Sequence, residues 1–142
     1  MWQFVVALAG AVILGLLAVL HFYWAFGGRF GKGAVVPERH GVPLFRPSRP
    51  MTVVVGLLLC GGSVCLFARL GLLGDGLPRD VLTACTWLMA AAFLLRSVGD
   101  FRYVGVFKRV AHTRFAYWDT RLFVPICLLL FAACVCAAVY GG

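Results

Sequence analysis

The stretch that decides the fold is 4-FVVALAGAVILGLLAVLHFYWAF-26, which contains no Asp, Glu, Lys or Arg. As an α-helix rising 1.5 Å per residue it would be about 35 Å long, enough to cross the ~30 Å hydrocarbon core of a bilayer. Three further apolar stretches follow it along the chain: Met51–Leu73, Val81–Leu95 and Leu122–Tyr140. The pattern predicts an all-α protein that forms an integral membrane four-helix bundle.

The composition agrees with a membrane protein. The 142 residues are 63% hydrophobic and only 13% charged, which lies outside the range of soluble proteins. Four spans in a chain of this length leave no room for a second domain, so we expect one domain over residues 1–142. The first stretch lacks a basic leader and is about twice as long as the apolar part of a signal peptide, so we interpret it as a retained helix. We place the spans at about 4–26, 51–73, 80–98 and 121–140.

Lysine and arginine are concentrated in two of the three loops. Five of the 13 lie between the first and second stretches, and six lie between the third and fourth or at their borders. Only Arg69, near the end of the second stretch, and Arg79 are assigned to the second loop. Cationic loops resist translocation, so loops one and three are expected in the cytoplasm and both termini outside. This asymmetry also accounts for the net charge of +8. We therefore expect anionic lipid headgroups as partners and no nucleic acid.

The third and fourth spans raise questions of helix geometry. Only fifteen uncharged residues separate Asp80 from Arg96, about 22 Å as a helix, so either the bilayer thins or the helix continues through Arg96. The second alternative is favoured because no helix breaker precedes Gly99. Asp119 is expected to cap the fourth helix, and Pro125 then requires a kink or a later helix start.

Residues 102–118 show a helical pattern of their own. On a helical wheel their aromatic and aliphatic side chains fill one half, while Arg102, Lys108 and Arg109 fall in the other. This predicts a basic amphipathic helix lying along the inner membrane interface. Arg114 falls in the apolar half, where it can either snorkel to lipid phosphates or point into the bundle.

All six cysteines lie inside the predicted spans, and no C-x-x-C pair occurs. We interpret them as small apolar packing residues, with a quinone-linked thiol relay as the alternative. We expect free thiols and no structural disulfide.

Antiparallel helices would bring several polar residues to the inner mouth of the bundle. Charged groups near the hydrocarbon are costly, so these are the candidate ligand-binding residues: His21, Trp24, Arg96, Asp100, Arg102, Arg114 and Asp119. Arg96 is expected to contact Asp100, four residues away, or Asp119, either as an internal ion pair that locks the helices or as part of a binding site. A pocket bounded by His21, Trp24 and Arg114 is expected to open toward the cytoplasmic leaflet.

No catalytic or metal-binding pattern is present. The chain has no G-x-S-x-G, no H-E-x-x-H and no carboxylates paired at a useful spacing. The one histidine within a span has no ligand partner three or four residues away, so we predict no metal and no cofactor. Inverted repeats of the transporter type are not apparent, because one long loop is proline-rich and the other is not.

Three blocks of sequence resemble a known family. They are His21-Phe-Tyr-Trp-Ala-Phe-Gly-Gly28, Arg96-Ser-Val-Gly-Asp-Phe-Arg-Tyr-Val-Gly-Val-Phe-Lys108, and Phe115-Ala-Tyr-Trp-Asp-Thr120 with Pro125. Together they are similar to a family of small bacterial four-helix membrane proteins of unknown function. The resemblance implies a multi-pass protein of the bacterial inner membrane, and it assigns no substrate or reaction.

Two classes of function remain open from the sequence. The first is a non-catalytic membrane module, either an accessory subunit or self-associating protein within a larger complex, or a binder of a lipid, amphipathic or anionic ligand at the inner mouth. The second is a small membrane enzyme or transporter that uses His21, Arg96 and Asp100. The few polar groups within the spans and the absence of a catalytic set favour the first class.

Overall fold

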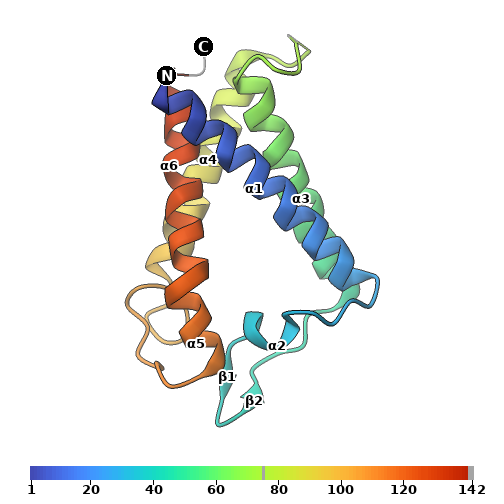
Figure 1. Ribbon diagram of the computed structural model, residues 1–142, viewed down its shortest axis with the longest axis vertical. Helices are drawn as coiled ribbons and strands as arrows, with labels where there is room; N and C mark the ends of the chain where they lie inside the picture. Colours follow the sequence, from blue (N-terminus) through green and yellow to red (C-terminus); the bar gives the residue numbers. More distant parts are fainter. Residues whose placement is uncertain (75, 141–142) are drawn as a thin grey trace.

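Four long helical segments run the length of the molecule and pack as a bundle (Figure 1). The computed structural model describes residues 1–74 and 76–140. The segments are α1 (Trp2–Ala25), α3 (Arg49–Arg69), α4 (Arg79–Val98), and a last one composed of α5 (Arg114–Trp118), the π-helical turn η1 (Asp119–Phe123) and α6 (Val124–Tyr140). Each is long and apolar enough to cross a membrane. The prediction of an all-α bundle of four candidate membrane-spanning helices is confirmed.

Small residues allow the helices to approach closely. Ala7, Ala11 and Ala18 on α1 are buried, and the Ser63 hydroxyl on α3 donates a 2.7 Å hydrogen bond to the Ala11 carbonyl. Where α1 packs against α6, a Cβ added to Gly10 would overlap the Cβ of Ala133. The core is formed where these surfaces meet and is lined mainly by small and aliphatic side chains. Helices packed through such small residues hold together by close van der Waals contact.

The two ends of the bundle differ. Trp2 and Tyr140 lie at one end, which we call the terminal end. At the other end, α1 and α6 diverge and a short segment crosses between them (Figure 1). This segment contains α2 (Lys32–Val35) and an antiparallel hairpin of β1 (Glu38–Arg39) and β2 (Val42–Pro43). We call this the α2 end.

The hairpin and α3 form for local reasons. His40 and Gly41 both have positive φ, 52° and 79°, as a tight hairpin turn requires. Ser48 then caps α3 by accepting the Met51 backbone N–H at 3.3 Å. The proline-rich loop therefore contains folded structure that closes the gap at the α2 end of the bundle.

The predicted second span extended to Leu73, but α3 ends at Arg69. Gly71, with φ of 72°, donates its N–H to the Ala68 carbonyl, and Leu72 donates to the Phe67 carbonyl. This is a glycine-terminated helix end, in which the left-handed glycine turns the chain away from the helix axis. Arg69 is consequently the last residue of the helix.

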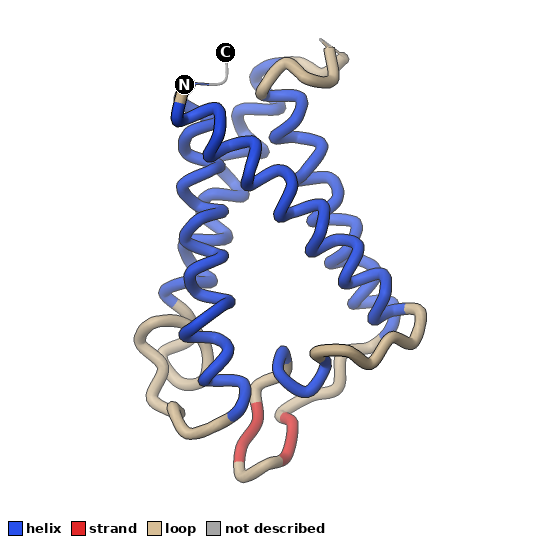
Figure 2. Tube along the Cα trace, viewed as in Figure 1, coloured by secondary structure: helices blue, strands red, loops and turns tan. Residues whose placement is uncertain are grey.

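The predicted helix over 102–118 is wrong. Only Arg114–Trp118 is helical, and the chain from Gly99 to Thr113 is a folded loop without regular structure (Figure 2). Gly99 and Gly105 adopt φ of 83° and 90°, which a continuing helix forbids. The wheel described the polarity of the side chains correctly, but the backbone conformation is set by the glycines and by Asp100.

The start of the fourth long segment also differs from the expectation. Thr113 caps it, accepting the Ala116 N–H at 3.0 Å, while Asp119 lies inside the helical run. In η1 the Val124 N–H reaches back to the Asp119 carbonyl, one residue further than in an α-helix. Pro125 follows directly after this wider turn, which accommodates a residue that cannot donate and whose ring would crowd the preceding turn. In contrast, α4 does continue through Arg96 to Val98, as predicted.

Candidate functional site

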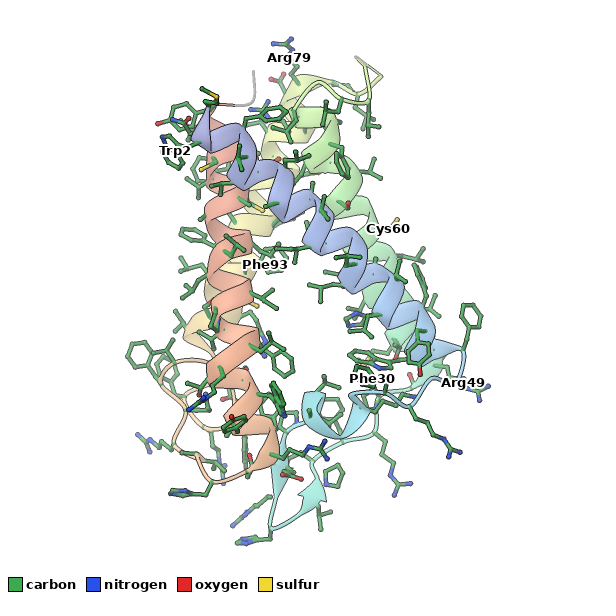
Figure 3. The ribbon with its side chains drawn as sticks, viewed as in Figure 1. Trp2, Phe30, Arg49, Cys60, Arg79 and Phe93 are labelled. Atoms are coloured by element: carbon green, nitrogen blue, oxygen red, sulfur yellow. The ribbon has the colours of Figure 1, made fainter. Side chains whose placement is uncertain are left out.

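A cavity of about 670 Å³ lies between the diverging parts of α1 and α6. Its lining comes from α1, α2 and its preceding turn, α4, and the α5–α6 segment. Phe30 at the α2 end and Phe93 at about mid-height in the bundle both line it (Figure 3). The cavity therefore extends from the α2 end toward the middle of the bundle.

Four of the predicted site residues border this cavity: His21, Trp24, Arg96 and Arg114. The imidazole Nδ1 of His21 donates to the Leu17 carbonyl at 2.7 Å, and the indole of Trp24 donates to the Phe30 carbonyl at 2.7 Å. The two rings meet edge to face, with their centroids 5.2 Å apart. Trp24 thus holds the turn before α2 against α1. Because the indole N–H is its one side-chain donor, Trp24 has no further donor for a ligand.

Arg96 is held by an acidic partner on another helix. Its Nη2 lies 2.7 Å from Oδ1 of Asp119, whose side chain is fully buried. The second oxygen of Asp119 accepts from Lys108 Nζ at 3.1 Å and from the Gly105 N–H at 2.9 Å. A buried carboxylate with two cationic partners and a backbone donor is fully compensated.

Lys108 completes this cluster and was not among the predicted site residues. Only 6% of its side chain is exposed, and its ammonium also donates to the Gly105 carbonyl at 3.0 Å and to Thr120 Oγ1 at 2.6 Å. The residue is the last in the 96–108 block that carries the family resemblance. Its position in that block was the one feature of the sequence that could have pointed to a role in the site. The helical wheel placed Lys108 on the polar side, where a lysine is expected to be exposed.

Asp100 does not pair with Arg96. One of its oxygens, Oδ1, accepts the backbone N–H groups of Arg102, Tyr103 and Val104 at 2.9, 2.7 and 2.9 Å. The helix ends at Val98, so the four-residue helical spacing that would have joined Asp100 to Arg96 does not exist. Slight burial raises the pKa of Asp100, but the three N–H donors outweigh it and hold the pKa below its ordinary value.

Arg102 is also absent from the lining of the cavity. Its guanidinium lies 5.3 Å from the centre of the Tyr103 ring, within the exposed loop. The structure thus brings His21, Trp24, Arg96 and Arg114 to one cavity, places Asp119 behind Arg96, and leaves Asp100 and Arg102 to organise the neighbouring loop.

Arg114 joins the cavity to the hairpin. Its backbone N–H donates to the Glu38 carboxylate at 3.0 Å, and its guanidinium lies close to Gly33 on α2. Of the two positions left open by the sequence, the structure places Arg114 in the lining of the cavity.

The electrostatic character of the cavity is simple. Arg96 and Arg114 are the cations of its lining, and among the described residues none that lines it is an Asp or Glu. Within residues 1–74 and 76–140, no group of three His, Cys, Asp or Glu side chains is arranged to hold a metal ion. What the arrangement offers is a mainly apolar wall with cationic hydrogen-bond donors at one end.

A second arginine with internal hydrogen-bond partners was missed at the terminal end. Arg69, the last residue of α3, donates through Nε and Nη2 to the carbonyls of Ala137 and Ala138 at 3.0–3.1 Å, and through Nη1 to Thr83. These carbonyls belong to the final turns of α6, where a helix lacks internal donors and attracts cations. The sequence prediction had placed this arginine in the second loop.

Comparison with known proteins gives a family and no function. No curated protein and no solved structure matches this chain. Residues 14–134 match the family described as "Protein of unknown function (DUF3995)". The matched region includes the cavity residues, the Asp119 cluster and the loop from Gly99 to Thr113, and the chain belongs to this family.

Proposed function

We propose that this chain is a non-catalytic integral membrane module that binds an amphipathic molecule at the α2 end of its bundle, alone or as an accessory subunit of a larger complex. The observation that carries the proposal is the 670 Å³ cavity, in which two guanidinium groups face an otherwise largely apolar lining. Its volume lies within the roughly 300–1,000 Å³ of small-ligand sites, which are typically apolar with a few well-placed polar groups.

The proposed setting is the inner membrane of a bacterium, with the α2 end in the cytoplasm and both termini outside. Eleven of the 13 Lys and Arg residues support this orientation by their position in or beside the first and third loops. A smaller cavity of about 380 Å³ beside α2 is lined by Lys32, Arg46 and Arg49, with Glu38 as its carboxylate. This surplus of cations supports contact with anionic headgroups.

The loop from Gly99 to Thr113 takes the interfacial position in this proposal. Its Phe101 and Phe107 rings stack 6.0 Å apart and are 57% and 60% exposed. The exposed Arg102 and Arg109 flank them. Aromatic rings beside cationic side chains suit the boundary between acyl chains and headgroups.

An enzyme or transporter built on His21, Arg96 and Asp100 has less support. Asp100 is used by three backbone N–H groups in the loop and does not line the cavity. Without it, the part of the chain that the structure describes gives the cavity no carboxylate to accept a proton or to bind a cation. Binding without reaction is the simpler use of the remaining groups.

The ligand-binding proposal is tested by recovering what the protein carries. The chain is extracted in a mild detergent, and bound lipids and amphiphiles are identified by mass spectrometry. Ile126→Trp, which fills the cavity, is expected to abolish the bound species. Leu128→Trp on the exposed side of α6 is the matched control and should retain it. Equal retention by both variants would remove the cavity as the binding site.

The orientation is tested separately. Reporter fusions after Tyr140 and in the hairpin near Arg39 should give opposite signals, with the hairpin cytoplasmic. A cytoplasmic signal from the C-terminal fusion would overturn the orientation while leaving the cavity proposal intact.

A further inference from the structure

We infer that the cavity is built for an amphiphile with one apolar chain and an oxyanion head, held with its head at Arg96 and Arg114 and its chain directed toward the middle of the membrane. This inference rests on the proposed function and specifies the ligand. It follows from the order of the lining residues, the donors left over on the two arginines and the volume of the cavity.

The lining residues are ordered along the helices. On α1 they run from Leu17 through Leu20 to His21 and Trp24 at the α2 end. On the α5–α6 segment they run from Leu130 through Ile126 and Leu122 to Trp118 and Arg114. Because both series become polar in the same direction, the cavity has one polar end and one apolar end.

The length of the apolar part sets the reach of a ligand. Leu122 to Leu130 is eight residues, about 12 Å of helix. This corresponds to less than half of a hydrocarbon core about 30 Å thick. A chain placed there would lie parallel to the lipid chains of the leaflet on the α2 side, with its head at the level of the headgroups.

The polar end retains unused donors. Among the described residues, the Arg96 guanidinium pairs only through Nη2, with Asp119, while its Nη1 is buried without a hydrogen-bond partner. About a third of the Arg96 side chain remains exposed. The guanidinium of Arg114 also has no hydrogen bond to the described residues, since its contact with Glu38 is through the backbone. Both groups carry a permanent charge and several N–H donors.

These donors select an oxyanion. The Asp119 charge is already shared by Arg96 and Lys108, and the Glu38 carboxylate lies against the backbone of Arg114, so these five groups together carry an excess of one positive charge. Interactions with this excess are strengthened next to hydrocarbon, where the dielectric constant is low. Guanidinium groups match the planar or tetrahedral oxygens of carboxylates and phosphates. A cationic head would be repelled, and an uncharged head would leave the surplus unpaired.

The volume favours a single chain. A cavity of about 670 Å³ suits one alkyl chain with its head, whereas a two-chain phospholipid is too large to fit within it. The shared chemistry of the ligand is therefore a single-chain carboxylate or phosphate monoester. A free fatty acid and a single-chain phospholipid or alkyl phosphate are its two possible sources.

The cavity contains its own reporter for a binding experiment. Cys127 lines the cavity, while Cys60 on α3 points away from the bundle (Figure 3). With the protein in phosphatidylcholine nanodiscs, the alkylation of each thiol by N-ethylmaleimide is followed by peptide mass spectrometry. The probes are dodecanoate, dodecyl phosphate, dodecanol and dodecyltrimethylammonium, which differ in the head and share the chain.

Dodecanoate or dodecyl phosphate should slow the alkylation of Cys127 and leave Cys60 unchanged. Whichever anion protects at the lower concentration identifies the source. Arg114→Gln should raise the half-protecting concentration of the anion about tenfold, the loss of one charge-assisted hydrogen bond. Arg109→Gln removes the same charge from the exposed loop and should have no effect. Since the Arg114 side chain makes no hydrogen bond to the described residues, its replacement should leave the melting temperature unchanged.

Three results would overturn the inference. Protection by dodecanol equal to that by the anions would reject the oxyanion head while leaving an amphiphile-binding cavity. Equal affinities in Arg114→Gln and the parent chain would reject the placement of the head. Protection of Cys127 by none of the four probes would reject the proposed function itself, and the inference with it.

Discussion

Arg96 and Asp119, 23 residues apart in the sequence, form an ion pair of 2.7 Å in which the carboxylate is fully buried. Lys108 binds the other oxygen of the same carboxylate. The pair thereby joins α4, the following loop and the π-helical turn of the last segment at one point. It also holds one side of Arg96 and leaves the other to the cavity.

Removing the charge of Asp119 should destabilise the fold. Asp119→Asn leaves Arg96 and Lys108 without their shared partner, and breaking buried pairs costs about 3–5 kcal/mol. We expect about 3 kcal/mol here, because Arg96 is a third exposed and water can compensate it. The free energy of unfolding in mixed micelles measures the change. Asp80→Asn, at an exposed position in the first turn of α4, is the control and should change stability by less than about 1 kcal/mol. Equal stabilities of the two variants would contradict the role of Asp119.

The loop from Gly99 to Thr113 should lose its order in acid. The pKa of Asp100 is lowered because three N–H donors favour the carboxylate. A lowered pKa means that the stabilisation is complete above the ordinary range for aspartate and disappears as pH falls through the lowered value. Amide exchange at Arg102, Tyr103 and Val104, corrected for the intrinsic pH dependence, should therefore remain slow at pH 5 and accelerate below about pH 4.

The variant Asp100→Ala should exchange rapidly at those three amides at every pH. Exchange within α4 serves as the internal reference and should be unaffected. A loop whose protection persists in Asp100→Ala would show that other contacts hold it.

The approach of α1 to α6 is tested at its closest point. In Gly10→Ala the new Cβ would overlap that of Ala133, so the helices must move apart. Overpacking of this kind costs about 1–3 kcal/mol. Gly61→Ala on α3 is the matched control, since a Cβ there meets nothing within 4 Å. That substitution should be neutral or slightly stabilising, because alanine is the better helix former. The thermal unfolding temperatures of the two variants in detergent are compared. If Gly10→Ala unfolds at the same temperature as the parent chain, the close contact between Gly10 and Ala133 is contradicted.

Arg69 is expected to stabilise the terminal end. Arg69→Gln removes donors from the carbonyls of Ala137 and Ala138, and hydrogen bonds to charged groups contribute about 1.5–3 kcal/mol. Exposed Arg79, which starts α4, provides the control substitution Arg79→Gln. The loss should appear as faster amide exchange in the last turns of α6. A similar response of the two variants would indicate that Arg69 acts only through its charge.

The sequence was most informative about helices and least informative about the chain between them. The spans could be predicted because the length of an apolar run is a local property, and because the lack of a breaker between Leu95 and Gly99 extends α4. The meeting of His21, Trp24, Arg96 and Arg114 followed from antiparallel topology alone. Their role in binding remains a prediction.

The loop after α4 could not be predicted from its pattern. The helical wheel of residues 102–118 considers only which side chains are polar. The conformation of this loop depends instead on which acceptors its backbone N–H groups bind. Asp100 binds three of them and Asp119 binds a fourth, from Gly105. The last of these bonds joins residues 14 positions apart. A contact between residues so far apart leaves no periodic pattern in the local sequence. The second span was predicted too long for a related reason, since the end of α3 depends on the φ of Gly71.

The π-helical turn Asp119–Phe123 has a consequence for which residues share a wall of the cavity. On an unbroken α-helix, the steps of four from Arg114 to Leu130 would drift about 160° around the axis. One extra residue in the wider turn takes back about 100° of that drift. Arg114, Trp118, Leu122, Ile126 and Leu130 can therefore all face the same cavity. Converting the turn to regular α-helix with all its residues kept would restore the full drift and turn Arg114 about 100° away from the leucines. The one extra residue in the π-helical turn therefore aligns the cationic part of this segment with its apolar part.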